Sequence, residues 1–323
     1  MSRPRRLVAL RALNLGDLLV VVPALRALRR HFADHEITLV SHAWLEPLAE
    51  LIGGIDRFRA TRGLAPLTAP LRPDVAVDLH GAGAGSAAAL AALVPRRHLG
   101  YAAPGRPGPA WPDGGHERGR WCELLVAHGI PADPDDLLLR PPPLQAPVPA
   151  ATVVHVGAGY GAKEWPLERF AAVAARLRVD GHRVVVTGSA AQRPRALTVA
   201  ERAGLPASDV LAGCTGLSEL AALVAGARLL VAGDTGVAHL ASAYRTPSVV
   251  LFGPAPIEEW GPPGSGPHRA LTVAERRRGD PFAADPDPAL LGVTVADVLD
   301  AVGEVLVVPA RSPRCGVADG IDR

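Results

Sequence analysis

The sequence predicts an α/β protein built from two Rossmann-like domains that face each other, each formed around a parallel sheet. Short apolar runs alternate with amphipathic helical stretches along the chain, and strands separated by helices are typical of a parallel sheet covered on both faces. The chain has 323 residues. That length fits two domains of about 150 residues each. A proline-rich stretch divides the alternation into two halves, as expected of a linker.

In the first half, each predicted strand is a short apolar run, and each predicted helix repeats its apolar residues every three or four positions. The strands are expected at 7–12, 37–42 and 74–80, and the helices at 17–32, 44–52, 86–93 and 116–130. The last of these helices ends at Gly129 and Pro131, which are residue types common at helix ends. We therefore assign residues 1–134 to the first domain and residues 135–150 to the linker.

The second half repeats the same alternation. Strands are expected at 152–157, 183–188, 228–233 and 247–253, and helices at 166–181, 193–204, 218–227, 235–243 and 293–306. This pattern defines a second domain over residues 151–308. The tail at 309–323 is rich in proline, glycine and charge without any period, so we expect it to be disordered.

Composition excludes several classes of protein. The chain has 34 basic and 32 acidic residues, and a formal charge of +2 gives no reason to expect nucleic acid as a partner. No apolar run reaches the roughly 18 residues of a membrane span, and nothing resembles a signal peptide, so we expect a cytoplasmic protein. Cys122, Cys214 and Cys315 are far apart and form no CxxC pair, which predicts neither a disulfide framework nor a metal site.

Four strand ends carry small or polar residues that suggest chemistry. The first is "NLGD", Asn14 to Asp17. Gly16 permits a tight turn, and Asp17 begins a helix, where aspartate is a common N-cap. A carboxylate at the rim of a cleft is also what a general base requires. From this stretch alone the N-cap is the more frequent use, and both roles can coexist.

The second strand end is "HVGAGYGAKEWP", which joins a glycine-rich turn to Lys163. Gly157 and Gly159 let the backbone approach a ligand closely, and Lys163 supplies a positive charge, so this stretch is a candidate diphosphate cradle. Residues 157–162 and 83–88 also have the spacing of a dinucleotide fingerprint. Neither is followed by the acidic residue expected about 20 positions later, at the end of the next strand, to hold a ribose. A nicotinamide-dependent dehydrogenase is therefore disfavoured.

The remaining two strand ends are "TGSAAQ" and "GDTGVAHLASA". Ser189 in the first of these could serve as an ordinary cap or as a ligand contact. In the second, Asp234 can cap the helix that follows, while Thr235 and Gly236 offer a hydroxyl and backbone N–H groups at the positive end of a helix dipole, where a phosphate is stabilised. His239, one turn later, could either pack against the sheet or contact the ligand.

Three segments together resemble glycosyltransferase family 9, the heptosyltransferases of lipopolysaccharide core synthesis. They are "RALNLGDLLVVVPALRALRRHF", "GAKEWPLERFAAVAARL" and "LAALVAGARLLVAGDTGVAHLASAYRTPSVVLFGP", with "DLHGAGAGS", "RRHLGY" and "HERGRWCELLVAHGI" in the expected order between the first two. The resemblance implies a GT-B fold, in which the first domain binds the acceptor and the second binds the nucleotide sugar. It also implies inverting transfer without a cofactor or required metal.

Carried over residue by residue, the resemblance assigns Asp17 as the general base of a Leu-Gly-Asp motif. It assigns Lys163, before Trp-Pro, to the donor phosphate. Asp234, Thr235, Gly236 and His239 match a donor motif, Asp-Thr/Ser-Gly-x-x-His, and we add Gly157 and Ser189 to the donor side. Asn14, Gly16 and His80 are the expected acceptor contacts. The expected partners are an ADP-heptose-like nucleotide sugar and a glycan or small-molecule glycoside, and a peripheral contact with a membrane stays open.

The chain departs from the family pattern at two places. Ala158 and Gly159 stand where relatives often have serine or threonine, and the loop "HGAGAGSAA" lacks basic residues that would grip a phosphorylated lipid-core sugar. The second departure favours a secondary-metabolite or cell-envelope glycoside as acceptor over lipopolysaccharide. Two alternatives remain at this point, a GT-B nucleotide-sugar epimerase and a non-catalytic protein that binds a sugar nucleotide.

Overall fold

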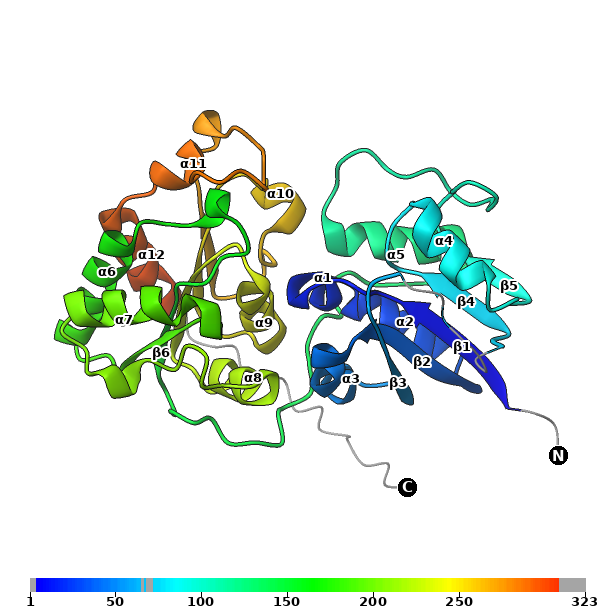
Figure 1. The fold of residues 1–323 in the computed structure, drawn as a ribbon, viewed down its shortest axis with the longest axis horizontal. Helices are drawn as coiled ribbons and strands as arrows, with labels where there is room; N and C mark the ends of the chain where they lie inside the picture. Colours follow the sequence, from blue (N-terminus) through cyan, green and yellow to red (C-terminus); the bar gives the residue numbers. More distant parts are fainter. Residues whose placement is uncertain (1–3, 65–66, 68–71, 308–323) are drawn as a thin grey trace, which may run out of the picture.

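The computed structural model describes residues 4–64, 67 and 72–307. It contains two five-stranded sheets, and every pairing between neighbouring strands in them is parallel. The two sheets and their helices form two lobes that face each other (Figure 1). The predicted α/β fold with two facing parallel sheets is confirmed. The tail predicted to be disordered, residues 309–323, lies outside the described residues.

The first sheet has the strand order β3-β2-β1-β4-β5. Its strands are β1 (Arg5–Leu10), β2 (His35–His42), β3 (Arg57–Thr61), β4 (Val75–Asp78) and β5 (Arg97–Leu99). Its helices are α1 (Leu15–Val20), α2 (Val22–His31), α3 (Glu46–Ile52), α4 (Ala84–Ala91) and α5 (Glu117–Ala127). The interior strand β4 is buried along its whole length, so both faces of the sheet are covered there.

The helix predicted over 17–32 is two helices. The break falls at Val21, whose ψ of 0° departs from helical geometry, directly before the first turn of α2. Pro23 explains the break, because proline has no N–H to donate to a preceding turn and is tolerated only near a helix start. The break makes α1 a short helix at the edge of the domain, facing the second lobe (Figure 1).

The second sheet has the strand order β10-β9-β8-β6-β7. Its strands are β6 (Thr152–His155), β7 (Val184–Thr187), β8 (Leu229–Gly233), β9 (Ser248–Leu251) and β10 (His268–Leu271). Its helices are α6 (Leu167–Val179), α7 (Arg193–Arg202), α8 (Leu217–Ala225), α9 (Gly236–Tyr244), α10 (Ile257–Trp260), α11 (Pro288–Leu291) and α12 (Val295–Val307). The sequence patterns did not predict β3, β5, β10, α10 or α11.

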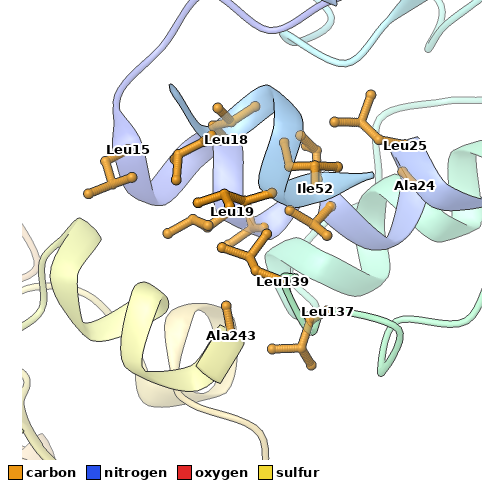
Figure 2. Close-up of a cluster of buried hydrophobic side chains, with 14 of the residues drawn as sticks. Leu15, Leu18, Leu19, Ala24, Leu25, Ile52, Leu137, Leu139 and Ala243 are labelled. Atoms are coloured by element: carbon orange, nitrogen blue, oxygen red, sulfur yellow. The ribbon is translucent and has the colours of Figure 1, made fainter. Parts of the chain in front are cut away.

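The two lobes share one hydrophobic core. A single cluster of buried side chains joins α1 and α2 of the first lobe to α8 and α9 of the second. Leu137 and Leu139, from the segment predicted to be a linker, are buried in it beside Ala243 of α9 (Figure 2). The Leu139 N–H also donates to the Ala243 carbonyl at 3.1 Å. This segment is therefore fixed between the lobes by packing.

Candidate functional site

Topology brings the predicted site residues to the facing edges of the two sheets. In each sheet the chain reverses its direction of strand addition once, between β1 and β4 in the first and between β6 and β8 in the second. Ligands of open α/β sheets bind outside the carboxyl ends of the strands at such switch points. The residues that follow these four strands include Asp17, His80, Lys163 and Asp234.

Asp17 lies at the third position of α1 and is not its N-cap, which corrects the interpretation made from the sequence. The N-cap is Asn14, and the Asn14 N–H donates to Asp17 Oδ2 at 3.1 Å. This is the reciprocal contact of a capping box, in which a carboxylate at the third position satisfies the backbone of the N-cap. About a quarter of the side-chain surface remains available, because the Asp17 side chain is 24% exposed.

Arg11, which was not predicted from the sequence, holds Asp17 in position by hydrogen bonds. Its side chain is 1% exposed, and it donates from Nε to the Asp17 carbonyl at 2.9 Å and from Nη2 to Oδ1 at 3.4 Å. Nη1 donates to the Leu79 carbonyl at 2.6 Å. Burial lowers the pKa of Arg11, and the charges of Asp17 and Glu117 oppose that shift. A lone arginine directly after a buried strand was the signal in the sequence that could have identified it.

His80 joins the same end of the first sheet. The Ala12 N–H donates to His80 Nδ1 at 3.3 Å, so the proton of a neutral ring is on Nε2. Burial lowers the pKa of His80, with a further contribution from the charge of Arg11. The neutral ring is therefore the form that stands next to Asp17 and Arg11 near pH 7.

Lys163 and Asp234 form the centre of the second half of the site. Lys163 Nζ donates to Asp234 Oδ2 at 2.6 Å, and their side chains are 23% and 6% exposed. Lys163 ends a short 3-10 turn at residues 161–163, and Asp234 directly follows β8. Lys163 is also the only lysine among the 34 lysine and arginine residues of the chain. A compact ammonium, and not a planar guanidinium, occupies this one position.

Thr235 is the N-cap of α9, a role expected of Asp234 from the sequence. Asp234 is instead engaged by Lys163. The buried Thr235 Oγ1 has no hydrogen-bond partner in the described part of the chain. A buried hydroxyl without a partner costs folding free energy unless a ligand or water forms a hydrogen bond with it. Its position at the start of a nine-residue helix favours an anionic ligand.

Gly236 and Gly16 allow the two lobes to meet. A Cβ on Gly236 would stand 2.7 Å from Leu15 Cβ, and a Cβ on Gly16 would stand 3.0 Å from His239 Cδ2. The first distance is too short for a Cβ atom and the second would be a very tight contact, so glycine at each position permits α1 and α9 to touch. The contact places Asp17, the neighbour of Gly16, at the same interface as His239.

His239 is buried and lies one turn into α9. Burial lowers its pKa to about 4; the charges of Asp234 and Asp17 oppose the shift and that of Arg118 adds to it. Its ring meets that of Trp260 edge-on, with centroids 6.1 Å apart. The ring is thus neutral near pH 7, and it both packs against the fold and borders the interface.

Gly157 and Ser189 lie at the ends of β6 and β7, farther from this centre. A Cβ on Gly157 would stand 2.6 Å from both His155 Nε2 and Gln192 Oε1, so packing alone requires glycine there. Ser189 is exposed and caps the short turn at 190–192, and its N–H donates to Gln192 Oε1 at 2.9 Å. Among the described residues, no hydrogen bond joins Ser189 to Lys163 or Asp234.

The described residues contain no group of three or more His, Cys, Asp or Glu side chains arranged to hold a metal ion. Cys122 and Cys214 are free thiols, and Cys315 lies outside the described range. Within that same range, no helix combines the length and the apolar character that a membrane crossing requires.

Two facing parallel sheets, with polar groups at both switch points, define the GT-B fold of glycosyltransferases. Solved structures share this fold. One is the glycosyl transferase family 9 structure from Veillonella parvula, with a TM-score of 0.78 and 19% identity over 94% of this chain and 97% of that one. Another is ADP-heptose lps heptosyltransferase II from E. coli, with a TM-score of 0.71 and 20% identity over 93% of this chain and 98% of that one. At these identities the likeness establishes the fold.

The sequence comparisons find a similarity to the same family over part of the chain. Residues 141–276 match the model of glycosyltransferase family 9 (heptosyltransferase). Lipopolysaccharide heptosyltransferase 2 of Escherichia coli K12 is 31% identical over 162 residues, which are 47% of this chain and 45% of the relative. Lipopolysaccharide heptosyltransferase 1 of Pseudomonas aeruginosa is 41% identical over 99 residues, 30% of this chain and 27% of the relative. The match thus spans less than half of each relative, and the resemblance to glycosyltransferase family 9 is confirmed.

Proposed function

We propose that the chain is an inverting, metal-independent glycosyltransferase. It would move a heptose-like sugar from a nucleotide diphosphate donor, an ADP-heptose-like molecule, to an acceptor hydroxyl. The observation that carries the proposal is the contact between α1 and α9. It brings a partly exposed carboxylate, Asp17, to the same interface as the Lys163–Asp234 pair and the start of α9.

In this mechanism Asp17 takes the proton of the acceptor hydroxyl. The acceptor oxygen attacks the anomeric carbon from the face opposite the diphosphate, and the electron pair of the breaking carbon–oxygen bond leaves with the diphosphate. The Lys163 ammonium and the N–H groups at the start of α9 stabilise the charge that grows on the leaving group. Thr235 Oγ1, unpartnered in the described chain, is free to donate to the same oxygens.

The fixed surroundings of Asp17 support its role as a base. Arg11 and the Asn14 N–H hold the carboxylate in one orientation before substrate arrives, which is how a catalytic group is pre-positioned. His80 lies at the same end of the first sheet as Asp17. Its neutral ring can hydrogen-bond an acceptor hydroxyl through Nε2. We propose Asn14, Gly16 and His80 as the acceptor side, and the surroundings of Lys163 as the donor side.

Product analysis tests the proposal. The chain is incubated with ADP-heptose and a panel of glycoside acceptors in EDTA, and the anomeric configuration of the product is read by NMR. A transferred sugar of inverted configuration is expected. A product formed from donor alone would favour an epimerase, donor binding without turnover would favour a silent binding protein, and turnover only with added Mg²⁺ or Mn²⁺ would contradict metal independence.

A further inference from the structure

Arg118 is a buried cation without a protein counter-ion. It lies at the second position of α5 in the first lobe, and it is 8% exposed. Nη1 donates to the Gly261 carbonyl of the second lobe at a long 3.3 Å, and Nε has no hydrogen-bond partner among the described residues. No carboxylate of the described chain lies within ion-pair distance of it.

The other buried arginines of the same lobe differ in this respect. Arg11 pairs with Asp17 and Glu117, Arg106 pairs with Asp78, and Arg120 pairs with Glu117. A buried guanidinium is normally compensated in this way, because removing an unpaired charge from water is costly. Burial lowers the pKa of Arg118, and the closest opposing influence is Asp135, which makes no ion pair with it. The missing partner is therefore an anion that the protein does not supply.

The position of Arg118 indicates where that anion binds. α5 approaches the second lobe beside α10 (Figure 1), and His116, the N-cap of α5, also contacts the Gly261 carbonyl, at 2.9 Å. His239 and His268 of the second lobe are near enough for the charge of Arg118 to lower their pKa values. The start of α5 adds the positive end of an 11-residue helix.

We propose that Arg118 binds the anionic oxygens of a substrate held between the lobes, with the planar guanidinium donating two hydrogen bonds to a phosphate or carboxylate. The inference rests on the proposed function. The anion has two possible sources, the diphosphate of the donor or an acidic group on the acceptor. Either way, a residue of the acceptor lobe completes a site whose other cation, Lys163, belongs to the donor lobe.

Calorimetric titrations of the full chain test this inference in two arms. ADP is titrated into the wild type, R118M and R118K, and inorganic phosphate is then titrated into the ADP-saturated proteins. We expect R118M to lose at least tenfold affinity in one arm, with R118K in between. A loss for ADP assigns Arg118 to the donor diphosphate, and a loss only for phosphate assigns it to an anionic acceptor.

His116→Asn is the matched control. Asparagine keeps an N-cap for α5 but is too short to reach Gly261, so it removes the stronger of the two contacts without removing the charge. If Arg118 only fastens the lobes together, H116N should weaken binding as much as R118M does, and R118M should unfold at lower temperature than the wild type. An anion site predicts the opposite, normal affinity in H116N and an unchanged or higher melting temperature in R118M.

Affinities of R118M within twofold of the wild type in both arms would overturn the inference. A K163M variant separates this failure from that of the proposed function. If ADP binding is lost in K163M and kept in R118M, the donor site stands and Arg118 is no part of it. If the wild type binds neither ADP nor phosphate, both proposals fail together.

Discussion

Gly16 and Gly236 face each other across the interface of the two lobes, so closely that a Cβ on Gly236 would stand 2.9 Å from the Gly16 backbone nitrogen. The same Cβ would stand 2.7 Å from Leu15 Cβ. Neither obstacle is a flexible chain end that could swing aside. The fit between α1 and α9 therefore depends on a missing methyl group on each helix.

Gly236→Ala should separate the two helices. We expect a loss of about 1–3 kcal/mol in the free energy of unfolding from overpacking, together with a drop in turnover as Asp17 moves away from the donor side. Denaturant unfolding and a rate measurement check this. Gly303→Ala is the control, because Gly303 lies in the helix α12 with nothing within 4 Å of its Cβ position. That variant should be stabilised by about 0.5–1 kcal/mol, and an equal effect of both substitutions would contradict the packing argument.

Asp17→Asn should separate catalysis from binding. The amide oxygen can still accept the Asn14 N–H, so stability should fall by about 1 kcal/mol at most. Turnover should fall by roughly 10² to 10⁴, because the amide cannot take a proton. ADP affinity, measured by calorimetry, should stay at the wild-type value since the donor side lies on the other lobe. Full turnover in a folded D17N protein would refute the proposed mechanism and leave the donor assignment intact.

The single lysine of the chain provides a direct measure of donor binding. Apart from the terminal amine, an amine-reactive acylating reagent has only Lys163 to modify, and mass spectrometry can follow that one site. ADP should protect Lys163 from acylation if its diphosphate lies against the ammonium. Lys163→Met should slow transfer by a factor corresponding to about 3 kcal/mol. Lys163→Arg keeps the charge and tests whether a compact ammonium is needed; acylation unaffected by saturating ADP would remove Lys163 from the site.

A buried ion pair supports the acceptor side. Arg106 Nη1 contacts Asp78 Oδ2 at 2.6 Å, with side-chain exposures of 5% and 0%, and Asp78 Oδ1 accepts the N–H of His80. Arg106→Met leaves a buried carboxylate without its cation and should destabilise the fold by about 3–5 kcal/mol. The double variant R106M/D78N should recover much of that loss. Urea unfolding checks both, and equal stability of R106M and the wild type would contradict the assignment.

Acid should destabilise the protein through its buried histidines. Burial lowers the pKa values of His155, His239 and His268 to about 4, and the charges of Arg118 and Arg245 add to the shift for His268. An unfolded histidine titrates near 6.5. Between these values the unfolded chain binds more protons, so the stability present above about pH 6.5 is lost as the pH falls toward 4.

Urea unfolding at pH 7, 6 and 5 measures this loss. His268→Asn, which can still contact Ser248, should reduce the proton uptake on unfolding at pH 5 by close to one proton. If the stability of the wild type does not change between pH 7 and pH 5, these histidines are not protected from protonation by the fold.

The central strands were predictable from sequence because they are buried on both faces and read as apolar runs. The edge strands were not. β3 has the sequence "RFRAT", in which exposed arginines alternate with half-buried residues, and β5 has only three residues. The break between α1 and α2 could have been placed from Pro23, but the apolar period continues through it and concealed the break.

The site divides in the same way. Asp17, Lys163 and the stretch from Asp234 to His239 could be singled out because each follows a strand whose end the sequence marks. Arg11 was marked only by its place directly after a buried strand. Arg118 could not be singled out, since its importance depends on which partner its side chain lacks in three dimensions. The predicted N-caps Asp17 and Asp234 were wrong, because the N-caps are the nearby residues Asn14 and Thr235. Several polar residues at a helix start can serve as the one N-cap, and the sequence does not say which of them does.

The core that the two lobes share has a thermodynamic consequence. Separating α1 from α9 to exchange substrate for product would expose Leu15 and its apolar neighbours to water. Hydration of apolar surface raises the heat capacity, so the open form would differ from the closed one by a positive heat-capacity change, and the equilibrium between them would curve with temperature. Exposure of leucine side chains to water would then contribute to the cost of opening.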